Sequence, residues 1–415
     1  MSTATETAAI RPFTVPVSAE SELEALRDRI KATRWPDAEL VADFSQGVQQ
    51  GVMQELARYW ATEYDLHRCE RRLSALPNFV TEVDGLDIHF IHVRASQEKH
   101  FLHPRSSQEN ALPVIITHGW PGSVIELLNV IDPLTNPTEH GASAEDAFDV
   151  VIPSIPGYGY SGKPRDLGWG PERVARVWDV LMKRLGYERY VAQGGDWGAI
   201  VTDLMGVQAP KGLAGIHSNM AGVVPTDAFT SLARNVFGAG DGPPPGLSEE
   251  ESATFEQLSN FFVTGVGYGV QMGTRPQTMY GLADSPVALA AWMINHDAGS
   301  YADIAAAFAG HPVGGLTRDE VLDNITYAWL TNTGVSSARF YWENTAGFFN
   351  VKGVKIPAAV STFAHEIYKV PRSWAERAYP NLIYFNALDR GNHFAAWQEP
   401  GLFSAELRAG FRSLR

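Results

Sequence analysis

The residue that is best placed to do chemistry is Asp196, at the centre of the sequence G-G-D-W-G (194–198). The apolar stretch before it, R-Y-V-A-Q (189–193), is typical of a strand, and glycines stand on both sides of the aspartate. This pattern is typical of a nucleophile elbow, a sharp strand-to-helix turn that exposes its central side chain. The alternative role for Asp196 is that of a helix N-cap. No G-x-S-x-G sequence exists in the chain to offer a serine instead.

A carboxylate at the centre of such an elbow indicates attack on a saturated carbon atom. A serine in the same place would form an ether with that carbon, and an ether offers water no easy route of cleavage. Asp196 would instead form an ester, whose carbonyl carbon water can attack in a second step. The sequence therefore predicts a two-step reaction that passes through an alkyl ester on Asp196.

The second step requires an oxyanion hole, and two backbone positions are candidates for it. The sequence H-G-W-P-G-S (118–123) follows V-I-I-T (114–117), a short apolar run that we interpret as a strand. In hydrolases of this type, one N–H donor comes from such a loop and the other from the residue after the nucleophile. These donors would be the backbone N–H groups of Trp120 and Trp197. The alternative for the loop is a tight turn that contains a packed histidine.

The base is expected late in the chain, because nucleophile, acid and histidine follow one another in this order in such folds. The predicted strand at 381–387 is followed by a glycine-containing loop with His393, which could deprotonate water. The acid that orients His393 should follow the preceding strand, at 357–363, and Glu366 stands there. Asp389 is the alternative acid, but it shares a loop with His393 and is interpreted as a turn residue.

The leaving group separates two classes of substrate. A haloalkane requires donors for the departing halide, and the indole N–H groups of Trp120 and Trp197 are candidates. An epoxide requires an acid that protonates the alkoxide. Tyrosine suits this task, because its pKa of about 10 lies below that of an alkoxide and still keeps it protonated at neutral pH. Tyr268 lies among glycines and Tyr341 in an aromatic run, and packing is the alternative role for either, since the chain has 14 tyrosines.

Two halves of an α/β core are predicted to position these residues. Short apolar runs alternate with helical patterns up to about residue 222, which is typical of a mostly parallel sheet covered by helices on both faces. A loop at 238–251 and a long helical or irregular stretch then interrupt the alternation, which predicts a cap over the ligand-binding edge of the sheet. The predicted strands are 86–93, 114–117, 149–153, 189–193, 213–219, 357–363 and 381–387, and the predicted helices are 21–30, 52–60, 123–131 and 171–185.

Composition restricts the class of protein. The chain of 415 residues is 45% hydrophobic and 19% charged, and its formal net charge is −14. Such an acidic chain is a poor partner for nucleic acid or for an anionic membrane surface. The single cysteine, Cys69, excludes an intrachain disulfide and fits a reducing compartment. The sequence shows neither a signal peptide nor a membrane-spanning apolar run, so that a cytoplasmic location is expected.

Seven sequence motifs occur in one order along nearly the whole chain. They are P-N-F-V-T-E-V-D-G-L-D-I-H-F-I-H-V (77–93), H-G-W-P-G-S (118–123), G-G-D-W-G (194–198), G-Y-G-V-Q-M-G-T-R-P-Q-T (267–278), D-S-P-V-A-L-A-A-W (284–292), R-F-Y-W-E-N (339–344) and G-N-H-F-A-A-W (391–397). In this order the motifs resemble those of the epoxide hydrolases in the microsomal and juvenile-hormone branch of the α/β-hydrolase fold. Seven ordered motifs are far more specific than any one of them.

The resemblance implies an organisation and a set of roles. It implies an N-terminal segment at 1–105 that wraps the core and holds the cap, core halves at 106–222 and 351–415, and a helical cap at 223–350. Motif by motif, it implies that Asp196 is the nucleophile, His393 the base and Glu366 the charge-relay acid. It also implies that Tyr268 and Tyr341 are the two ring-opening tyrosines. The chain departs from the family pattern at Y-D-L-H-R-C-E (64–70), where Asp-Trp-Arg is usual, and in lacking the membrane anchor of some relatives.

The predicted activity is the cofactor-independent hydrolysis of an apolar, bulky epoxide to a vicinal diol, with water as the second substrate. Haloalkane dehalogenation and non-catalytic binding of apolar ligands are the alternatives. No metal site is predicted, because His89 and His92 lie on opposite faces of a strand and no ligand cluster completes a site with either. A homodimer is compatible with the sequence, which leaves the oligomeric state open.

Overall fold

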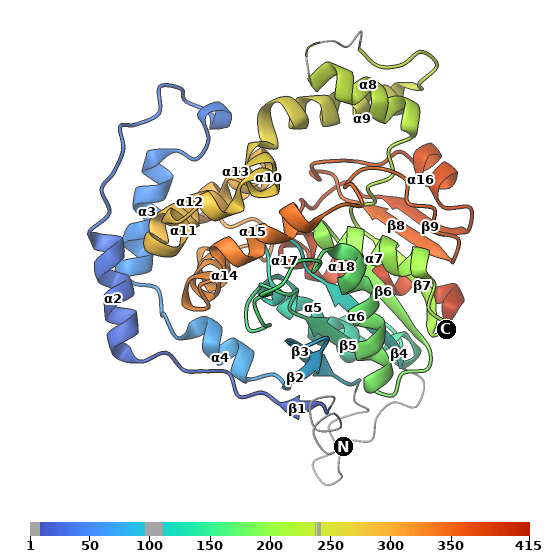
Figure 1. Cartoon of the computed structure of the whole chain (residues 1–415), viewed down its shortest axis with the longest axis horizontal. Coiled ribbons are helices and arrows are strands. Elements are labelled where there is room, and N and C mark those ends of the chain that lie inside the picture. Colours follow the sequence, from blue (N-terminus) through green and yellow to red (C-terminus); the bar gives the residue numbers. More distant parts are fainter. Residues whose placement is uncertain (1–8, 96–110, 237, 239–241) are drawn as a thin grey trace.

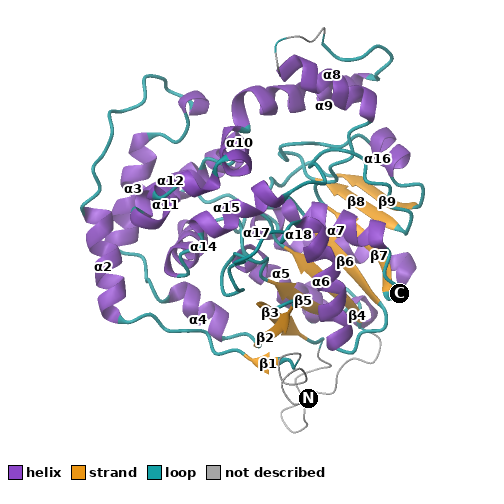
Figure 2. Cartoon of the chain, viewed as in Figure 1, coloured by secondary structure: helices purple, strands orange, loops and turns teal. Residues whose placement is uncertain are grey.

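A computed structural model describes residues 9–95 and 111–415, apart from 237 and 239–241. Its strands form one nine-stranded sheet in the order β1-β2-β3-β5-β4-β6-β7-β8-β9 (Figures 1 and 2). Strands β4 to β9 pair in parallel, whereas β1, β2 and β3 pair antiparallel with one another and β3 pairs antiparallel with β5. The strands are β1 (Arg11–Pro12), β2 (Asn78–Val83), β3 (Leu86–Val93), β4 (Leu112–Thr117), β5 (Phe148–Pro153), β6 (Tyr190–Gly194), β7 (Leu213–Ser218), β8 (Ala358–Thr362) and β9 (Leu382–Ala387).

Both faces of the sheet are covered, as the continuous apolar strands predict. In β4, Val114 and Ile116 pack into one hydrophobic core, whereas Ile115 between them packs into the other. Helices α5 (Leu128–Thr135), α17 (Ala395–Gln398) and α18 (Pro400–Gly410) contribute to the first core. Helices α6 (Pro171–Arg184), α7 (Trp197–Gln208) and α16 (Arg372–Ala378) contribute to the second. Burial on both faces explains why these strands are apolar throughout.

A helical segment separates β7 from β8 and lies to one side of the sheet (Figure 1). Its helices in the described residues are α8 (Thr226–Val236), α9 (Glu249–Asn260), α10 (Gly267–Thr274), α11 (Gly281–Asp284), α12 (Pro286–Ile294), α13 (Ala298–Phe308), α14 (Arg318–Leu330) and α15 (Gly334–Glu343), with a π-helical turn at Phe261–Gly265. A short 3-10 helix, Pro276–Thr278, also belongs to this segment, and those elsewhere in the described residues are Phe44–Gln46, Val124–Leu127, Pro137–His140, Ala144–Asp146 and Arg412–Leu414.

The prediction of a loop through residue 251 is wrong at its C-terminal end, because α9 begins at Glu249. The Ser248 side chain accepts a hydrogen bond from the Glu251 N–H group, and the Glu251 carboxylate accepts one from the Ser248 N–H group. This capping box satisfies two backbone donors that would otherwise be free at the start of the helix. Residues 239–241 of the predicted loop lie outside the described residues.

Three N-terminal helices contact the helical segment in turn. Helices α2 (Glu20–Lys31), α3 (Gln50–Thr62) and α4 (Arg68–Ser74) lie against α12, α13 and α14 respectively (Figure 1). Between α4 and α14, Arg68 and Arg72 pair with Glu320 and Asp323, and the Asp323 side chain is fully buried. Leu66, within the stretch 64–70 that departs from the family pattern, is buried in the first core. The predicted boundary at 105 lies outside the described residues.

Within the described residues, none of the helices combines the length and the apolar character needed to cross a membrane.

Candidate active site

The turn between β6 and α7 holds Asp196 in a strained backbone conformation, with φ 50° and ψ −125°. Neighbouring glycines make the turn possible. A Cβ atom at Gly194 would lie 2.0 Å from the Gly198 carbonyl oxygen, and one at Gly198 would lie 2.0 Å from the Thr117 carbonyl oxygen. The sequence G-G-D-W-G is therefore needed for the close approach of strand, turn and helix, and it forms the predicted elbow.

The Asp196 carboxylate lies against the loop that follows β4. Its Oδ1 atom accepts a 2.7 Å hydrogen bond from the Trp120 N–H group. The approach is close because residue 119 is glycine: a Cβ atom there would lie 2.4 Å from both Cβ and Oδ1 of Asp196. The Trp197 N–H group belongs to the first residue of α7, directly after Asp196. The two backbone amides that the sequence predicts as oxyanion donors therefore come from the two segments that flank this carboxylate.

Other residues fix the loop at 118–123. The Asn324 side chain, on α14, donates to the Pro121 carbonyl oxygen at 2.8 Å and accepts from the Ser123 hydroxyl at 2.7 Å. His118 accepts a 3.1 Å hydrogen bond from the Ile155 N–H group, and its other ring nitrogen lies 3.0 Å from the Gly119 carbonyl oxygen. Burial lowers the pKa of His118 to about 4, so it is a neutral packing residue of the loop.

His393 and Glu366 form a hydrogen-bonded pair beside Asp196. His393 Nδ1 lies 2.6 Å from Glu366 Oε1, and His393 Nε2 lies 3.8 Å from Asp196 Oδ2. The two loops are joined beyond the ends of β8 and β9, where the His365 N–H group donates to the Gly391 carbonyl oxygen at 2.9 Å. The alternative acid, Asp389, is exposed to solvent. The structure therefore pairs His393 with the residue that the strand order predicts.

The charge of His393 depends on the carboxylates around it. Burial alone would lower the pKa of this imidazole, but Glu366, Asp196 and Asp297 together raise its pKa to about 10. In the unreacted protein His393 is therefore an imidazolium, held between the carboxylates of Glu366 and Asp196.

Tyr268 and Tyr341 come from the helical segment and lie over the two tryptophans that flank Asp196. The Tyr268 ring stacks on Trp120 with 5.1 Å between centroids, and the Tyr341 ring meets Trp197 edge-on at 4.6 Å. The two tyrosine rings are 6.3 Å apart. Burial, followed by the negative charge of Asp196, raises the pKa of both phenols well above its usual value. Both therefore remain protonated donors beside the carboxylate.

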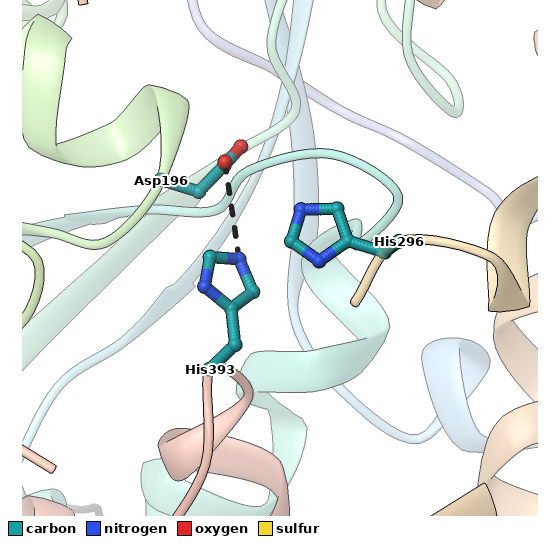
Figure 3. A group of neighbouring side chains, drawn as sticks. All are labelled: Asp196, His296 and His393. Carbon is teal, nitrogen blue, oxygen red and sulfur yellow. Dashed lines mark ion pairs between the residues drawn. The ribbon is translucent and has the colours of Figure 1, made fainter. Parts of the chain in front are cut away.

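Three residues of the site were not predicted from the sequence. Glu126 follows the loop at 118–123, and burial raises the pKa of its carboxyl group to about 8. His296 packs against His393, with 4.4 Å between ring centroids (Figure 3). Asp297 bonds to the Nδ1 atom of His296 at 2.9 Å. The only sequence signal for this pair is the adjacent His-Asp in the stretch I-N-H-D (294–297). Glu126 gave no signal beyond a lone acid in an apolar helical pattern.

Two cavities meet at Trp120. The first lies beside Asp196 and His393, and its wall includes the polar side chains of Thr117, Glu126, Gln193 and Asn219. The second has large apolar and aromatic side chains in its wall, among them Tyr158, Leu289, Trp292, Met293 and Tyr327. Apolar side chains, among them Leu127, Phe394 and Trp397, complete the wall of the first cavity, and polar ones, among them Ser123 and Asn324, complete that of the second.

Comparisons with known proteins extend these observations to the whole chain. A family model described as the epoxide hydrolase N terminus matches residues 10–127, and one described as the alpha/beta hydrolase fold matches residues 113–262. The chain is 47% identical over 407 residues to a protein of Stigmatella aurantiaca named "Putative epoxide hydrolase", which covers 98% of this chain and 86% of that protein. It is 34% identical over 416 residues to epoxide hydrolase 1 of Oryctolagus cuniculus, which covers 97% of this chain and 88% of that protein.

Solved structures agree. The juvenile hormone epoxide hydrolase from the silkworm Bombyx mori superposes with a TM-score of 0.81 and 29% identity, over 98% of this chain and 96% of that chain. The Aspergillus niger epoxide hydrolase gives a TM-score of 0.78 and 27% identity, over 99% and 97% of the two chains. Because relatives of this similarity span almost its full length, the chain belongs to the epoxide hydrolases of the α/β-hydrolase fold, in the branch of the microsomal and juvenile-hormone enzymes.

Proposed function

We propose that this epoxide hydrolase converts an apolar epoxide to a vicinal diol through a covalent ester on Asp196. One observation supports the proposal above all. The Asp196 carboxylate accepts a hydrogen bond from Trp120 N–H, lies 3.8 Å from Nε2 of the Glu366-bound His393, and its charge raises the pKa of the two buried phenols, Tyr268 and Tyr341. A nucleophile, an acid for the leaving oxygen and a base for water are then all present within one buried site.

In the first step, Tyr268 and Tyr341 hold the epoxide oxygen while an Asp196 oxygen attacks a ring carbon. The C–O bond of the ring breaks as the ester bond forms, and a phenol protonates the alkoxide. The dehalogenase alternative depended on tyrosines remote from Asp196. Both phenols instead lie close enough for the Asp196 charge to raise their pKa, which favours ring opening over halide departure.

Ester formation also prepares the second step. The Asp196 charge is one of the causes that raise the pKa of His393, and this charge disappears when the carboxylate becomes an ester. His393 therefore releases its proton more readily after alkylation, which restores a protonated phenol and leaves a neutral imidazole. Glu366 keeps the Nδ1 proton in place, so that Nε2 is free to act as the base.

Neutral His393 then takes a proton from water, and the hydroxide attacks the ester carbonyl carbon. The oxyanion lies where Trp120 and Trp197 N–H groups can donate to it. Collapse breaks the bond between that carbon and the diol oxygen, which receives the proton. The cavity beside Asp196 and His393 is the space we assign to the attacking water.

The substrate is proposed to be apolar because the second cavity is lined by large apolar and aromatic side chains. Four curated relatives and one solved structure are named for juvenile hormone epoxide hydrolase, and these names are consistent with a bulky apolar epoxide. We further propose that the enzyme acts in the cytoplasm and needs no cofactor. A homodimer remains a prediction from the sequence.

Mass spectrometry of His393→Gln tests the proposal. The variant is expected to react with styrene oxide but not to release diol, so that intact mass rises by the whole epoxide and peptide mapping places the adduct on Asp196. The double variant Asp196→Asn/His393→Gln is the matched control and should gain no mass. His365→Gln, which changes an exposed histidine beside Glu366, should turn over without accumulating the ester. An adduct on another residue would refute the assignment of the nucleophile.

A further inference from the structure

His296 lies inside the active site but has no part in the proposed reaction. Its side chain is 1% exposed, and its ring contacts His393, Trp120 and Tyr268. Its Nδ1 atom bonds to Asp297 Oδ2 at 2.9 Å. Its Nε2 atom is buried and has no hydrogen-bond partner among the described residues. A buried ring nitrogen without a partner requires an explanation, because it loses its hydrogen bonds to water on folding.

His296 and His393 are arranged alike. Each imidazole has a carboxylate at Nδ1, Asp297 in one case and Glu366 in the other, which places the proton of a neutral ring on Nδ1 and leaves the lone pair on Nε2. Figure 3 shows both rings directed toward the Asp196 carboxylate. One ligand atom from each of the three residues lies within 4.8 Å of the other two. Two imidazole nitrogens and a carboxylate oxygen therefore lie within 4.8 Å of one another.

This arrangement has the chemistry of a transition-metal site. Metal-bound histidines generally donate their second ring N–H to a carboxylate, which orients the ring and raises its basicity. Around Zn²⁺, with bonds of about 2.0–2.1 Å in a tetrahedral geometry, ligand atoms are roughly 3.4 Å apart. The 3.8 Å between His393 Nε2 and Asp196 Oδ2 needs to shorten by about 0.4 Å, and the distances to the His296 ligand atom, which are within 4.8 Å, by up to about 1.4 Å. Three protein ligands also leave a fourth position for water.

We propose that Asp196, His296 and His393 form an inhibitory site for Zn²⁺ and chemically similar divalent ions. An ion there displaces the Nε2 proton of His393 and takes the lone pairs of the nucleophile and of the base, so it competes with the epoxide. It cannot persist once Asp196 has become an ester, because one ligand is then lost. Mg²⁺ and Ca²⁺ prefer oxygen ligands and are expected not to bind. The ligand set joins positions 196, 296 and 393, which no local spacing in the sequence brings together.

Cobalt spectroscopy tests the site without relying on turnover. The untagged protein, dialysed against EDTA, is titrated with Co²⁺, and the visible ligand-field bands are followed. We expect one ion per chain, with affinity weakened at least about tenfold in His296→Gln and in Asp196→Asn, which removes a ligand while keeping its shape. His140→Gln is the matched control, because this histidine pairs with Asp132 in an exposed position far from Asp196 in sequence. Circular dichroism verifies that each variant is folded.

Inhibition of diol formation by Zn²⁺ gives the second readout. The inhibition constant, taken relative to the metal-free rate of each variant, should rise at least about tenfold in His296→Gln and stay unchanged in His140→Gln. Unaltered Co²⁺ bands in both His296→Gln and Asp196→Asn would overturn the proposal. So would inhibition by Mg²⁺ as strong as that by Zn²⁺. If the unmodified protein binds no Zn²⁺ and ester formation on Asp196 is nevertheless observed in His393→Gln, only the metal site is refuted and the proposed reaction stands.

Discussion

Gly119 allows the loop after β4 to approach the nucleophile closely, and Gly119→Ala tests how far the reaction depends on this approach. An added Cβ atom would lie 2.4 Å from Cβ and Oδ1 of Asp196 and 2.7 Å from its Cγ. These atoms belong to a short side chain on a strained turn, so they cannot rotate away as the end of a long side chain could. The backbone conformation itself accepts alanine, because the φ angle of Gly119 is not positive. Any effect therefore comes from the steric overlap.

The overlap must separate the loop from Asp196, and the 2.7 Å hydrogen bond from Trp120 N–H is the first contact to lengthen. Loss of one oxyanion donor typically costs about 10²–10³ in kcat, or about 2.7–4 kcal/mol. Overpacking of a buried position costs about 1–3 kcal/mol of stability. We therefore expect Gly119→Ala to remain folded while kcat falls at least about a hundredfold.

Steady-state hydrolysis of styrene oxide, measured alongside thermal unfolding, separates the two effects. Gly51→Ala is the matched control, since a Cβ atom there meets no described atom within 4 Å. It should keep its activity and gain up to about 1 kcal/mol of stability, as alanine replaces glycine inside a helix. A folded Gly119→Ala enzyme with the kcat of the unmodified chain would refute the reasoning.

Three further perturbations have defined outcomes. Tyr268→Phe/Tyr341→Phe should slow ester formation in single-turnover experiments while the unfolding midpoint stays close to that of the unmodified chain. Arg72→Met should cost about 3 kcal/mol in urea unfolding, because its Nη1 atom lies 2.6 Å from the buried carboxylate of Asp323. The exposed Arg71→Met should cost no more than about 1 kcal/mol. Finally, when the pH falls from 7.5 to 5.5, the free energy of unfolding of His217→Phe should rise by about 1.4 kcal/mol relative to that of the unmodified chain.

The sign of the last effect follows from burial, which lowers the pKa of His217 to about 3. The unfolded chain binds a proton near pH 6.5 and the folded chain does not, so this histidine reduces stability as the pH falls below 6.5. Comparing the variant with the unmodified chain at both pH values cancels the other titrating groups. If the difference in unfolding free energy between His217→Phe and the unmodified chain is the same at pH 7.5 and 5.5, the lowered pKa of His217 is contradicted. If Arg72→Met and Arg71→Met lower the unfolding free energy equally, the role of the buried ion pair is contradicted. For the tyrosines, ester formation at the unmodified rate is the contrary result.

Much of the sheet and part of the site follow from local patterns. The apolar runs, the glycines around Asp196 and the order of strands predict the elbow, and they place Glu366 rather than Asp389 beside His393. These residues could be predicted because Asp196, Glu366 and His393 each follow the end of a strand, and the carboxyl ends of parallel strands share one edge of the sheet. The two tyrosines needed the family resemblance as well, because a tyrosine among glycines carries no local sign of what it faces.

The remainder depends on long-range packing that no short pattern contains. His296 belongs to a helical segment that is far from His393 in the sequence and packs against the N-terminal helices, so its contact with His393 has no local signature. Glu126 is buried beside the loop at 118–123, in the wall of a cavity that His393 also lines. The capping box at Ser248 is a local signal, but the prediction of a loop at 238–251 did not include it.

The paired charges between α4 and α14 have a consequence for exchanging parts between relatives. Asp323 is buried with two arginines from the N-terminal segment, and the next residue on α14, Asn324, holds the loop that carries Trp120. An N-terminal segment grafted from a homologue without matching cations would leave this carboxylate without its counter-ions. We therefore expect chimeric enzymes to fold and turn over only when both sides of the pairing are transferred together, and substitutions at Arg68, Arg72 and Asp323 to be inherited as a set.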